Sequence, residues 1–123
     1  MTPLDQPILL VATKEPQRAR AFYEDVLGLS FVSDEPWALV FDVGSTMLRI
    51  QKVEHLSQIP YTVFGWRVNN IRKTMSELLQ RGVQFEQYEQ LHQDERGVWE
   101  TPDGTKVCWF RDPDSNTLSL TQH

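Results

Sequence analysis

The feature that most constrains the fold of this chain is a repeat of its hydrophobic pattern. In both halves a short apolar run is followed by an amphipathic helical pattern, a glycine and further strand-like segments. Segment 28–31 (GLSF) aligns with segment 82–85 (GVQF) at an offset of 82 − 28 = 54 residues. Leu48 aligns with Leu118 at an offset of 118 − 48 = 70, so the second half holds about 70 − 54 = 16 extra residues before its last strand. Such a repeat is typical of duplicated units that share one core.

The first half predicts a strand, a helix and three further strands. Apolar positions in segment 15–27 recur three and four residues apart, as on one face of an amphipathic helix, and Gly28 ends this pattern. Segment 46–52 alternates with a period of two, so we expect Leu48 and Ile50 to face the core and the residues beside them to face away. The other strands expected in this half are 8–13, 29–32 and 37–43.

The second half repeats this order after a segment without periodicity, residues 53–60, which we interpret as a linker. Asn69 or Asn70 is a suitable cap for the expected helix, and the polar residues 89–96 predict a mobile loop. The elements expected here are strands over 61–68 and 83–88, a helix over 71–80, and short strands over 98–100, 107–110 and 117–121. We therefore expect a single domain over 1–123, with module 1 at about 7–52 and module 2 at about 61–122.

Composition excludes several classes of protein. The formal charge is 12 − 17 = −5 and the sequence has no block of Lys and Arg, which argues against a nucleic-acid partner. No apolar run is long enough to cross a membrane, and the N-terminal residues show no secretory signal, so we expect a cytoplasmic protein. Cys108 is the one cysteine, which excludes a disulfide framework and a multi-cysteine metal site.

Two segments of the chain match structural motifs of a known family. Segment 21–29 (AFYEDVLGL) ends the first expected helix, and segment 109–120 (WFRDPDSNTLSL) spans the last expected hairpin. Both resemble the vicinal oxygen chelate superfamily, which includes glyoxalase I, extradiol dioxygenases and bleomycin resistance proteins. Ser115 stands where the family usually has glycine, which suits a turn position at positive φ, so we expect the serine to cost a little strain or to shift the turn. The resemblance implies an α+β fold in which two βαβββ modules form curved mixed sheets around a cavity.

The resemblance also implies four positions at which metal-bearing members place their ligands. These positions fall at Ile8, Arg49, Ser119 and either Thr62 or Val63. An isoleucine side chain has no lone pair to offer, and an arginine is a permanent cation that repels a divalent ion. We therefore expect no metal site of the family's type and no cofactor.

Side chains on the outward strand faces predict a cup with aromatic walls, hydroxyl groups and one fixed cation. Such a surface suits a small aromatic or amphipathic molecule with an anionic group, for which Arg49 would be the charge partner. A plainer interpretation is that the strand aromatics form core and that Arg49 pairs with a carboxylate of the fold. The candidate ligand-binding residues are Arg49, Gln51, Trp66, Trp109, Ser119, Thr121 and Trp37.

No residue of the chain is identified as catalytic. The three histidines, His55, His92 and His123, lie outside the four ligand positions. His92 lies close to Asp94 in the charged loop, which would allow this loop to close over a ligand as a lid. Cys108 has no histidine beside it, so we expect an inert buried thiol rather than a nucleophile.

Three functions remain open. The first is metal-free binding of a small molecule, by sequestration without chemistry, as in the bleomycin resistance branch. The second is an enzyme of the same fold, either a metal-dependent lyase or dioxygenase with displaced ligands, or a cofactorless catalyst that uses Arg49 as an electrophile. The third is a structural or interaction module whose cavity is filled by its own side chains. We further expect a homodimer, as in related proteins.

Overall fold

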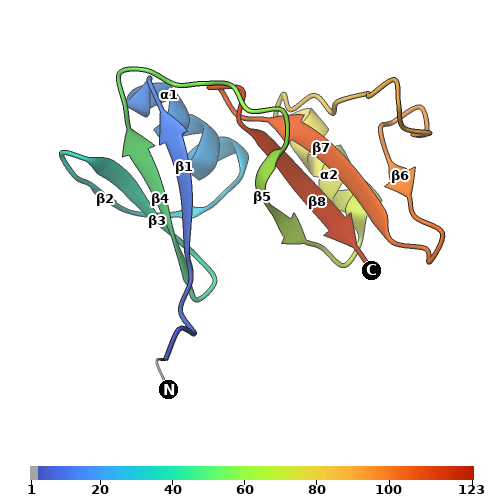
Figure 1. Ribbon diagram of the computed structural model, residues 1–123, viewed down its shortest axis with the longest axis horizontal. Helices are drawn as coiled ribbons and strands as arrows, with labels where there is room; N and C mark the ends of the chain where they lie inside the picture. Colours follow the sequence, from blue (N-terminus) through green and yellow to red (C-terminus); the bar gives the residue numbers. More distant parts are fainter. Residues whose placement is uncertain (1–2) are drawn as a thin grey trace. The chain divides into compact units, whose positions relative to one another are not determined.

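A computed structural model describes residues 3–123 of the chain and shows an α+β architecture (Figure 1). The chain forms two compact units, one ending at Gln58 and the other beginning at Ile59, each with one four-stranded mixed sheet. The elements are β1 (Ile8–Thr13), α1 (Pro16–Ala21), the π-helical turn η1 (Phe22–Val26), β2 (Ser30–Asp34), β3 (Ala38–Val43), β4 (Thr46–Lys52), β5 (Thr62–Arg67), α2 (Ile71–Gln80), β6 (Trp99–Glu100), β7 (Lys106–Arg111) and β8 (Thr117–Gln122). Within the described part of the chain, no helix has both the length and the apolar character needed to cross a membrane.

The sheet of the first unit has the strand order β1-β4-β3-β2, with β1 parallel and β3 antiparallel to β4. The predicted alternation of β4 is confirmed, since Leu48 and Ile50 are fully buried and Gln51 is exposed. Tyr23 is also fully buried, and its ring lies 6.1 Å from the ring of Phe41 on the core side of the sheet. The helix layer therefore covers the face of the sheet that carries the buried residues of β4.

The first helix is shorter than the sequence predicts. The α-helix ends at Ala21, and the chain continues as a π-helical turn in which the amide of Leu27 donates to the carbonyl of Phe22 at 2.9 Å. This bond spans five residues rather than four, so the turn is wider than an α-helical turn. Gly28 follows with a φ of 74°, as expected for the glycine that ends a helix.

The sheet of the second unit has the strand order β5-β8-β7-β6, and α2 lies behind β7 and β8 in Figure 1. The side chain of Asn70 caps the helix by accepting a hydrogen bond from the amide of Lys73 at 3.1 Å, as one of the two asparagines was expected to do. Gln122 at the end of β8 accepts from the amide of Ile71 at 2.8 Å. Two amides of the first turn of α2 are thus hydrogen-bonded by side chains, one of which comes from β8 of the same sheet. The helix buries Ile71, Met75 and Leu78.

The predicted strand over 83–88 is wrong. This segment makes a single antiparallel bridge, between Phe85 and Phe110, before it leaves the edge of β7. The carbonyl of Glu86 and the amide of Tyr88 instead bind the side chain of Gln93. Because a side chain satisfies these backbone groups, no partner strand is needed at this edge.

The turn between β7 and β8 explains how serine replaces the family's glycine. Ser115 has a φ of 66°, so of the two expected outcomes the turn keeps a positive φ and the serine bears the strain. Asp112 is buried, and its carboxylate accepts hydrogen bonds from the amides of Asp114 and Asn116, each at 2.9 Å. These bonds fix the turn and offset the strain of a residue with a β-carbon at this position.

Candidate ligand-binding site

The open face of the second sheet, opposite α2, collects three of the candidate residues. Trp109 pairs with Ser119 across β7 and β8, and Thr121 follows two positions later on the same side. Gly65 and Arg67 of β5 pair with Ser119 and Thr121, so they lie on this face as well. We use the term second open face for the surface of Thr62, Gly65, Arg67, Val107, Trp109, Ser119 and Thr121.

The indole of Trp109 lies across the second open face. Its Nε1 donates to the hydroxyl oxygen of Thr62 at 3.1 Å. Trp109 is on β7 and Thr62 on β5, on either side of β8, so these strands are about 9.6 Å apart, two strand spacings. The indole must therefore span β8. Thr117, the partner of Thr62 on β8, is accordingly buried.

Two further rings pack against this indole. The ring of Tyr88 meets that of Trp109 edge-on at 5.5 Å, and the ring of Trp99 lies 6.3 Å away at a tilt of 34°. All three residues are partly exposed, and we call them the aromatic cluster. Burial, together with the carboxylate of Glu86, raises the pKa of Tyr88 above its ordinary value, so its phenol stays neutral. The cluster is an uncharged aromatic surface that remains open to solvent.

Polar groups flank the aromatic cluster. The hydroxyl of Ser119 makes no hydrogen bond to any residue of 3–123, and a β-carbon at Gly65 would overlap this hydroxyl and the carbonyl of Ser119. Glycine at position 65 therefore leaves room for the serine side chain. Arg67 is exposed and forms no ion pair with another described residue. A hydroxyl and a guanidinium are thus available to a ligand on the second open face.

The remaining candidates except Trp66 belong to the first unit. Arg49 and Gln51 lie on the face of β4 opposite Leu48 and Ile50, as predicted, and within the described residues Arg49 has no ion-pair partner. The expected alternative, a salt bridge that replaces the metal, is therefore not formed within residues 3–123. Trp37 is 78% exposed in the turn before β3.

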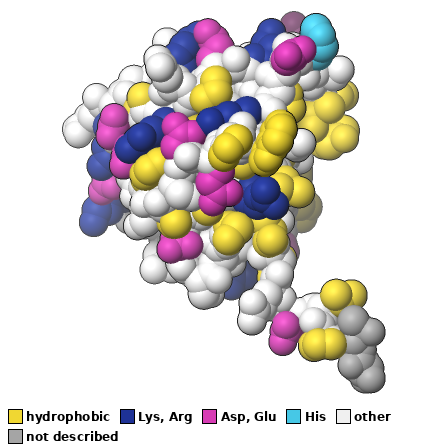
Figure 2. All heavy atoms as spheres, turned by 90° about the vertical axis from the view of Figure 1, so that its left-hand side faces the viewer, with side chains coloured by type: hydrophobic (Ala, Val, Ile, Leu, Met, Phe, Trp, Pro, Cys, Tyr) yellow, Lys and Arg dark blue, Asp and Glu magenta, His cyan; other side chains and the backbone are white. Residues whose placement is uncertain are grey.

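Exposed apolar side chains also belong to the first unit, among them Ile8 and Leu10 of β1 and Met47 of β4. Figure 2 shows one side of the molecule, where hydrophobic side chains form small groups separated by charged ones. On that side they do not merge into one large apolar surface of the kind that marks an obligate interface.

Trp66 does not lie beside Ser119, and its expected placement is wrong. A register shift between Thr62 and Phe64 brings Trp66 opposite Leu120, on the helix-covered side of the sheet. There its ring stacks on that of Phe110 with a centroid distance of 6.4 Å. Gly65 and Arg67 occupy the open side of β5 instead.

The loop of residues 86–98, which we call the aromatic loop, is held by hydrogen bonds along its length. Asp94 accepts from Arg72 of α2 at 2.7 Å, so its carboxylate is already engaged. The aromatic loop carries Tyr88 and leads directly into Trp99. Sequence reasoning missed both aromatics and Gln93, because the alternation of 83–88 indicates a strand where Gln93 holds a loop, and β6 has only two residues.

The donor set at the family's four ligand positions does not fit a metal. Ile8 and Arg49 lie on the open face of the first sheet, and Thr62 and Ser119 on that of the second. Among residues 3–123 no group of three or more His, Cys, Asp or Glu side chains is placed to hold a metal ion. Cys108 faces the core, and burial raises the pKa of its thiol to about 12. Its sulfur is therefore a poor ligand and a poor nucleophile.

A comparison with protein families identifies the family of this chain. The family model described as Glyoxalase/Bleomycin resistance protein/Dioxygenase superfamily matches residues 6–120. No curated protein sequence matches the chain.

Solved structures share the fold at low sequence identity. A lactoylglutathione lyase from Agrobacterium tumefaciens is 16% identical with a TM-score of 0.75, over 98% of this chain and 95% of that one. A glyoxalase family protein from Enterococcus faecalis is 20% identical with a TM-score of 0.75, over 98% and 99% of the two chains. A glyoxalase/bleomycin resistance protein/dioxygenase from Alicyclobacillus acidocaldarius is 19% identical with a TM-score of 0.72, over 99% and 93%. At these identities the likeness establishes the two-module α+β fold alone.

Proposed function

The chain belongs to the glyoxalase/bleomycin resistance protein/dioxygenase superfamily, and on that premise we propose that it binds a small aromatic molecule without a metal at the family's ligand positions. The observation that carries this proposal is the aromatic cluster across the second open face. Tyr88, Trp99 and Trp109 are packed together yet partly exposed, so aromatic surface that would gain from burial is open on this face. A flat aromatic ligand would cover them and remove this surface from water.

The polar groups favour a ligand that also carries an anionic group. Arg67 stands on the same face as the cluster with no carboxylate partner among the described residues, and Ser119 offers a hydroxyl. A guanidinium binds carboxylate, sulfonate or phosphate oxygens through two parallel hydrogen bonds. Arg49 and Gln51 provide a comparable cation and amide on the open face of the first sheet.

Fluorescence titration with 1-anilinonaphthalene-8-sulfonate, a small aromatic sulfonate, tests this function. We expect saturable binding that weakens about tenfold or more in Trp109→Ala, since base–aromatic and similar stacking contacts contribute about 1–3 kcal/mol. Tyr61→Ala is the matched control, because Tyr61 is exposed and lies outside the cluster. Equal binding by wild type and Trp109→Ala would contradict the proposed site.

The cations are tested in the same titration. Arg67→Ala should weaken binding, because its guanidinium lies on the second open face, whereas Lys73→Ala on α2 should not. Calorimetry with Ni²⁺ and Fe²⁺ should show no equimolar binding, because the donor set includes an isoleucine and an arginine. Equimolar metal binding with turnover of a thiohemiacetal or a catechol would support the enzymatic alternative instead.

Oligomeric state is part of the same proposal. The resemblance to the superfamily leads us to propose a homodimer, and the mass measured by light scattering would test this. A monomer at the concentrations used for the titration would contradict it.

A further inference from the structure

Gln93 holds the two ends of the aromatic loop together through its side-chain amide. Its Oε1 accepts a hydrogen bond from the amide of Tyr88 at 2.6 Å. Its Nε2 donates to the carbonyl of Glu86 at 2.9 Å and to the carbonyl of Gly97 at 2.7 Å. Gln93 also forms an isolated antiparallel bridge with Trp99. One amide therefore fixes the backbone at Tyr88 and close to Trp99.

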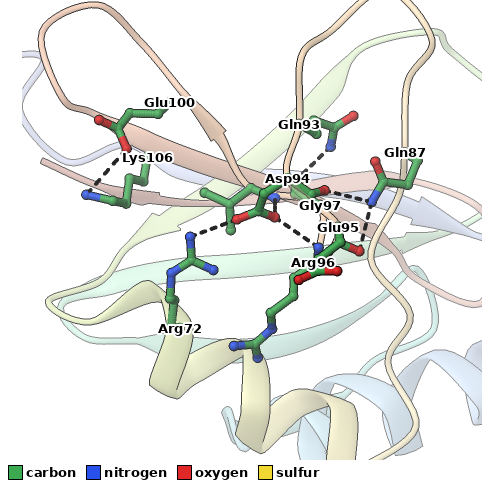
Figure 3. Close-up of polar contacts among 10 residues, drawn as sticks. Arg72, Gln87, Gln93, Asp94, Glu95, Arg96, Gly97, Glu100 and Lys106 are labelled. Carbon is green, nitrogen blue, oxygen red and sulfur yellow. Dashed lines mark hydrogen bonds and ion pairs between the residues drawn. The ribbon is translucent and has the colours of Figure 1, made fainter.

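Asp94, the next residue, ties the aromatic loop to α2 (Figure 3). One carboxylate oxygen accepts from the amides of Arg96 and Val98, each at 2.9 Å, and the other accepts from Arg72 at 2.7 Å. The guanidinium of Arg96 donates to the hydroxyl of Ser76 at 3.0 Å, one helical turn beyond Arg72. These contacts fix residues 94 and 96 of the loop to α2.

The two anchors act on different parts of the loop. The bonds of Asp94 end at α2 and at the backbone of residues 96 and 98. Those of Gln93 include the backbone of Tyr88, whose ring packs against Trp109. Gln87 adds weaker contacts, since its Nε2 lies 3.2 Å and 3.4 Å from the carbonyls of Asp94 and Glu95. Gln93 is thus the side chain that connects the loop's hydrogen bonding to the geometry of the cluster.

We propose that Gln93 is a positioning residue of the ligand-binding surface, which holds the rings of Tyr88 and Trp99 against Trp109 before any ligand arrives. This inference rests on the proposed binding function and adds a residue that touches no ligand itself. Its effect is preorganisation, because rings already held in place lose little freedom when a ligand covers them. A loop without this amide would have to order its rings at the moment of binding.

Gln93→Ala and Gln93→Glu, with Gln90→Ala as the matched control, test the proposal. Gln90 is exposed in the same loop and its side chain makes no hydrogen bond to a described residue. The readouts are the near-ultraviolet circular dichroism of the ligand-free protein, the affinity for 1-anilinonaphthalene-8-sulfonate, and the far-ultraviolet spectrum as a measure of folding. The near-ultraviolet signal reports the coupling of the packed rings without any ligand.

We expect Gln93→Ala to retain the far-ultraviolet spectrum, lose much of the near-ultraviolet signal and bind the dye about tenfold more weakly, because the three hydrogen bonds of its amide are lost and the rings must then be ordered on binding. Gln93→Glu should bind the dye no more tightly than Gln93→Ala, because it keeps the acceptor for the amide of Tyr88 but places a carboxylate oxygen against the carbonyls of Glu86 and Gly97. Gln90→Ala should match wild type in all three readouts.

Failure of this inference can be told from failure of the proposed function. If Trp109→Ala loses dye binding while Gln93→Ala keeps both its affinity and its near-ultraviolet signal, the positioning role is overturned and the binding function stands. If Trp109→Ala binds normally, the proposed function fails, and the near-ultraviolet signal of Gln93→Ala still decides the positioning role. If both Gln93 variants fail to fold and Gln90→Ala folds, Gln93 serves stability in general and the proposal is overturned.

Discussion

Phe31 packs edge-on against Phe41 in the first unit, with ring centroids 5.5 Å apart and planes at 77°. Phe85 packs against Phe110 in the second unit in the same way, at 5.8 Å and 74°. The two pairs occupy matching places in the repeat, since 85 − 31 = 54, and Phe41 pairs with Leu48 as Phe110 pairs with Leu118. After Phe31 the chain continues along β3 as β2, whereas after Phe85 it leaves the sheet and forms the aromatic loop. The same aromatic packing in the two cores is therefore compatible with two different paths of the chain, a strand after Phe31 and a loop after Phe85.

The open faces differ much more than the cores. Val40 and Arg49 pair in the first sheet, and Trp109 and Ser119 occupy the matching places in the second. The first sheet thus presents a cation among aliphatic side chains, while the second presents an indole joined by the rings of Tyr88 and Trp99. Core residues are constrained by packing, whereas loops and open faces are where function diverges.

The largest effect is expected from the difference in solvent access between the two faces of β7, which carry Cys108 and Trp109. Because burial raises the pKa of Cys108 to about 12 from an ordinary value of 9.0, the thiolate that reacts is about a thousandfold scarcer than in an exposed thiol. We predict that an aromatic disulfide reagent at pH 8 labels the native protein about a thousandfold more slowly than the urea-unfolded protein. Acrylamide should nevertheless quench tryptophan fluorescence in the native state. Rapid labelling of the folded protein would show that the helix-covered face is open.

Gly65→Ala is expected to destabilise the second unit by about 2–3 kcal/mol, the upper range for overpacking. The added β-carbon would overlap the backbone carbonyl of Ser119, so rotation of the serine side chain cannot relieve the contact. The free energy of unfolding in urea measures this effect. Ser119→Ala is the control and should change it by less than about 0.5 kcal/mol. Wild-type stability of Gly65→Ala would mean that β5 and β8 are not in the register described.

Much of the fold could be predicted from the sequence, because it depends on periodic burial. The alternation of β4 and the cap at Asn70 were both predictable from local patterns. The positive φ at Ser115 was one of two outcomes that the family resemblance left open. The strand predicted over 83–88 does not form. The alternation of this segment is genuine, but its backbone groups bind the side chain of Gln93 and not a partner strand.

The candidate site was predicted less completely. Both faces of β5 carry large side chains, so the sequence could not decide between them, and a register shift of one residue exchanges the faces. Trp66 was misplaced for this reason. Trp109 and Ser119 were placed together correctly because β7 and β8 form an antiparallel pair joined by a recognisable turn. Tyr88 reaches the cluster from a loop and not from a strand ladder, and Trp99 lies in the two-residue strand β6, which is too short to show alternation.

A smaller effect is expected from acid on the anchor of the aromatic loop. Burial alone would raise the pKa of Asp94, but the hydrogen bonds from Arg72 and from the amides of Val98 and Arg96 outweigh it and hold this pKa below the ordinary carboxyl value. The pKa of Asp94 is lower in the folded state than in the unfolded state. The carboxylate therefore stabilises the fold at pH values above its unfolded pKa, and this stabilisation is lost as the pH falls through its folded pKa. We predict that Asp94→Asn loses less stability than wild type between pH 6 and pH 3, measured by urea unfolding.

Glu95→Gln is the matched control for this acid effect. The side chain of Glu95 makes no hydrogen bond to the residues that the structure describes, so its pH profile should follow that of wild type. An Asp94→Asn profile that also follows wild type would show that the carboxylate does not anchor the loop.

The smallest effect is expected for Arg49→Met in the first unit. Arg49 has no ion-pair partner among residues 3–123, so its replacement should change the free energy of unfolding by less than about 0.5 kcal/mol. Arg72→Met should cost more, because it leaves the carboxylate of Asp94 without its guanidinium. A large loss of stability in Arg49→Met would make Arg49 a structural residue rather than a group available to a ligand.

Native mass spectrometry of the protein purified from its own host reports bound organic molecules and metals in one spectrum. We predict a small organic adduct that is lost in Trp109→Ala, with no equimolar divalent metal. A spectrum with an equimolar metal and no organic adduct, unchanged in Trp109→Ala, would contradict metal-free binding at the second open face.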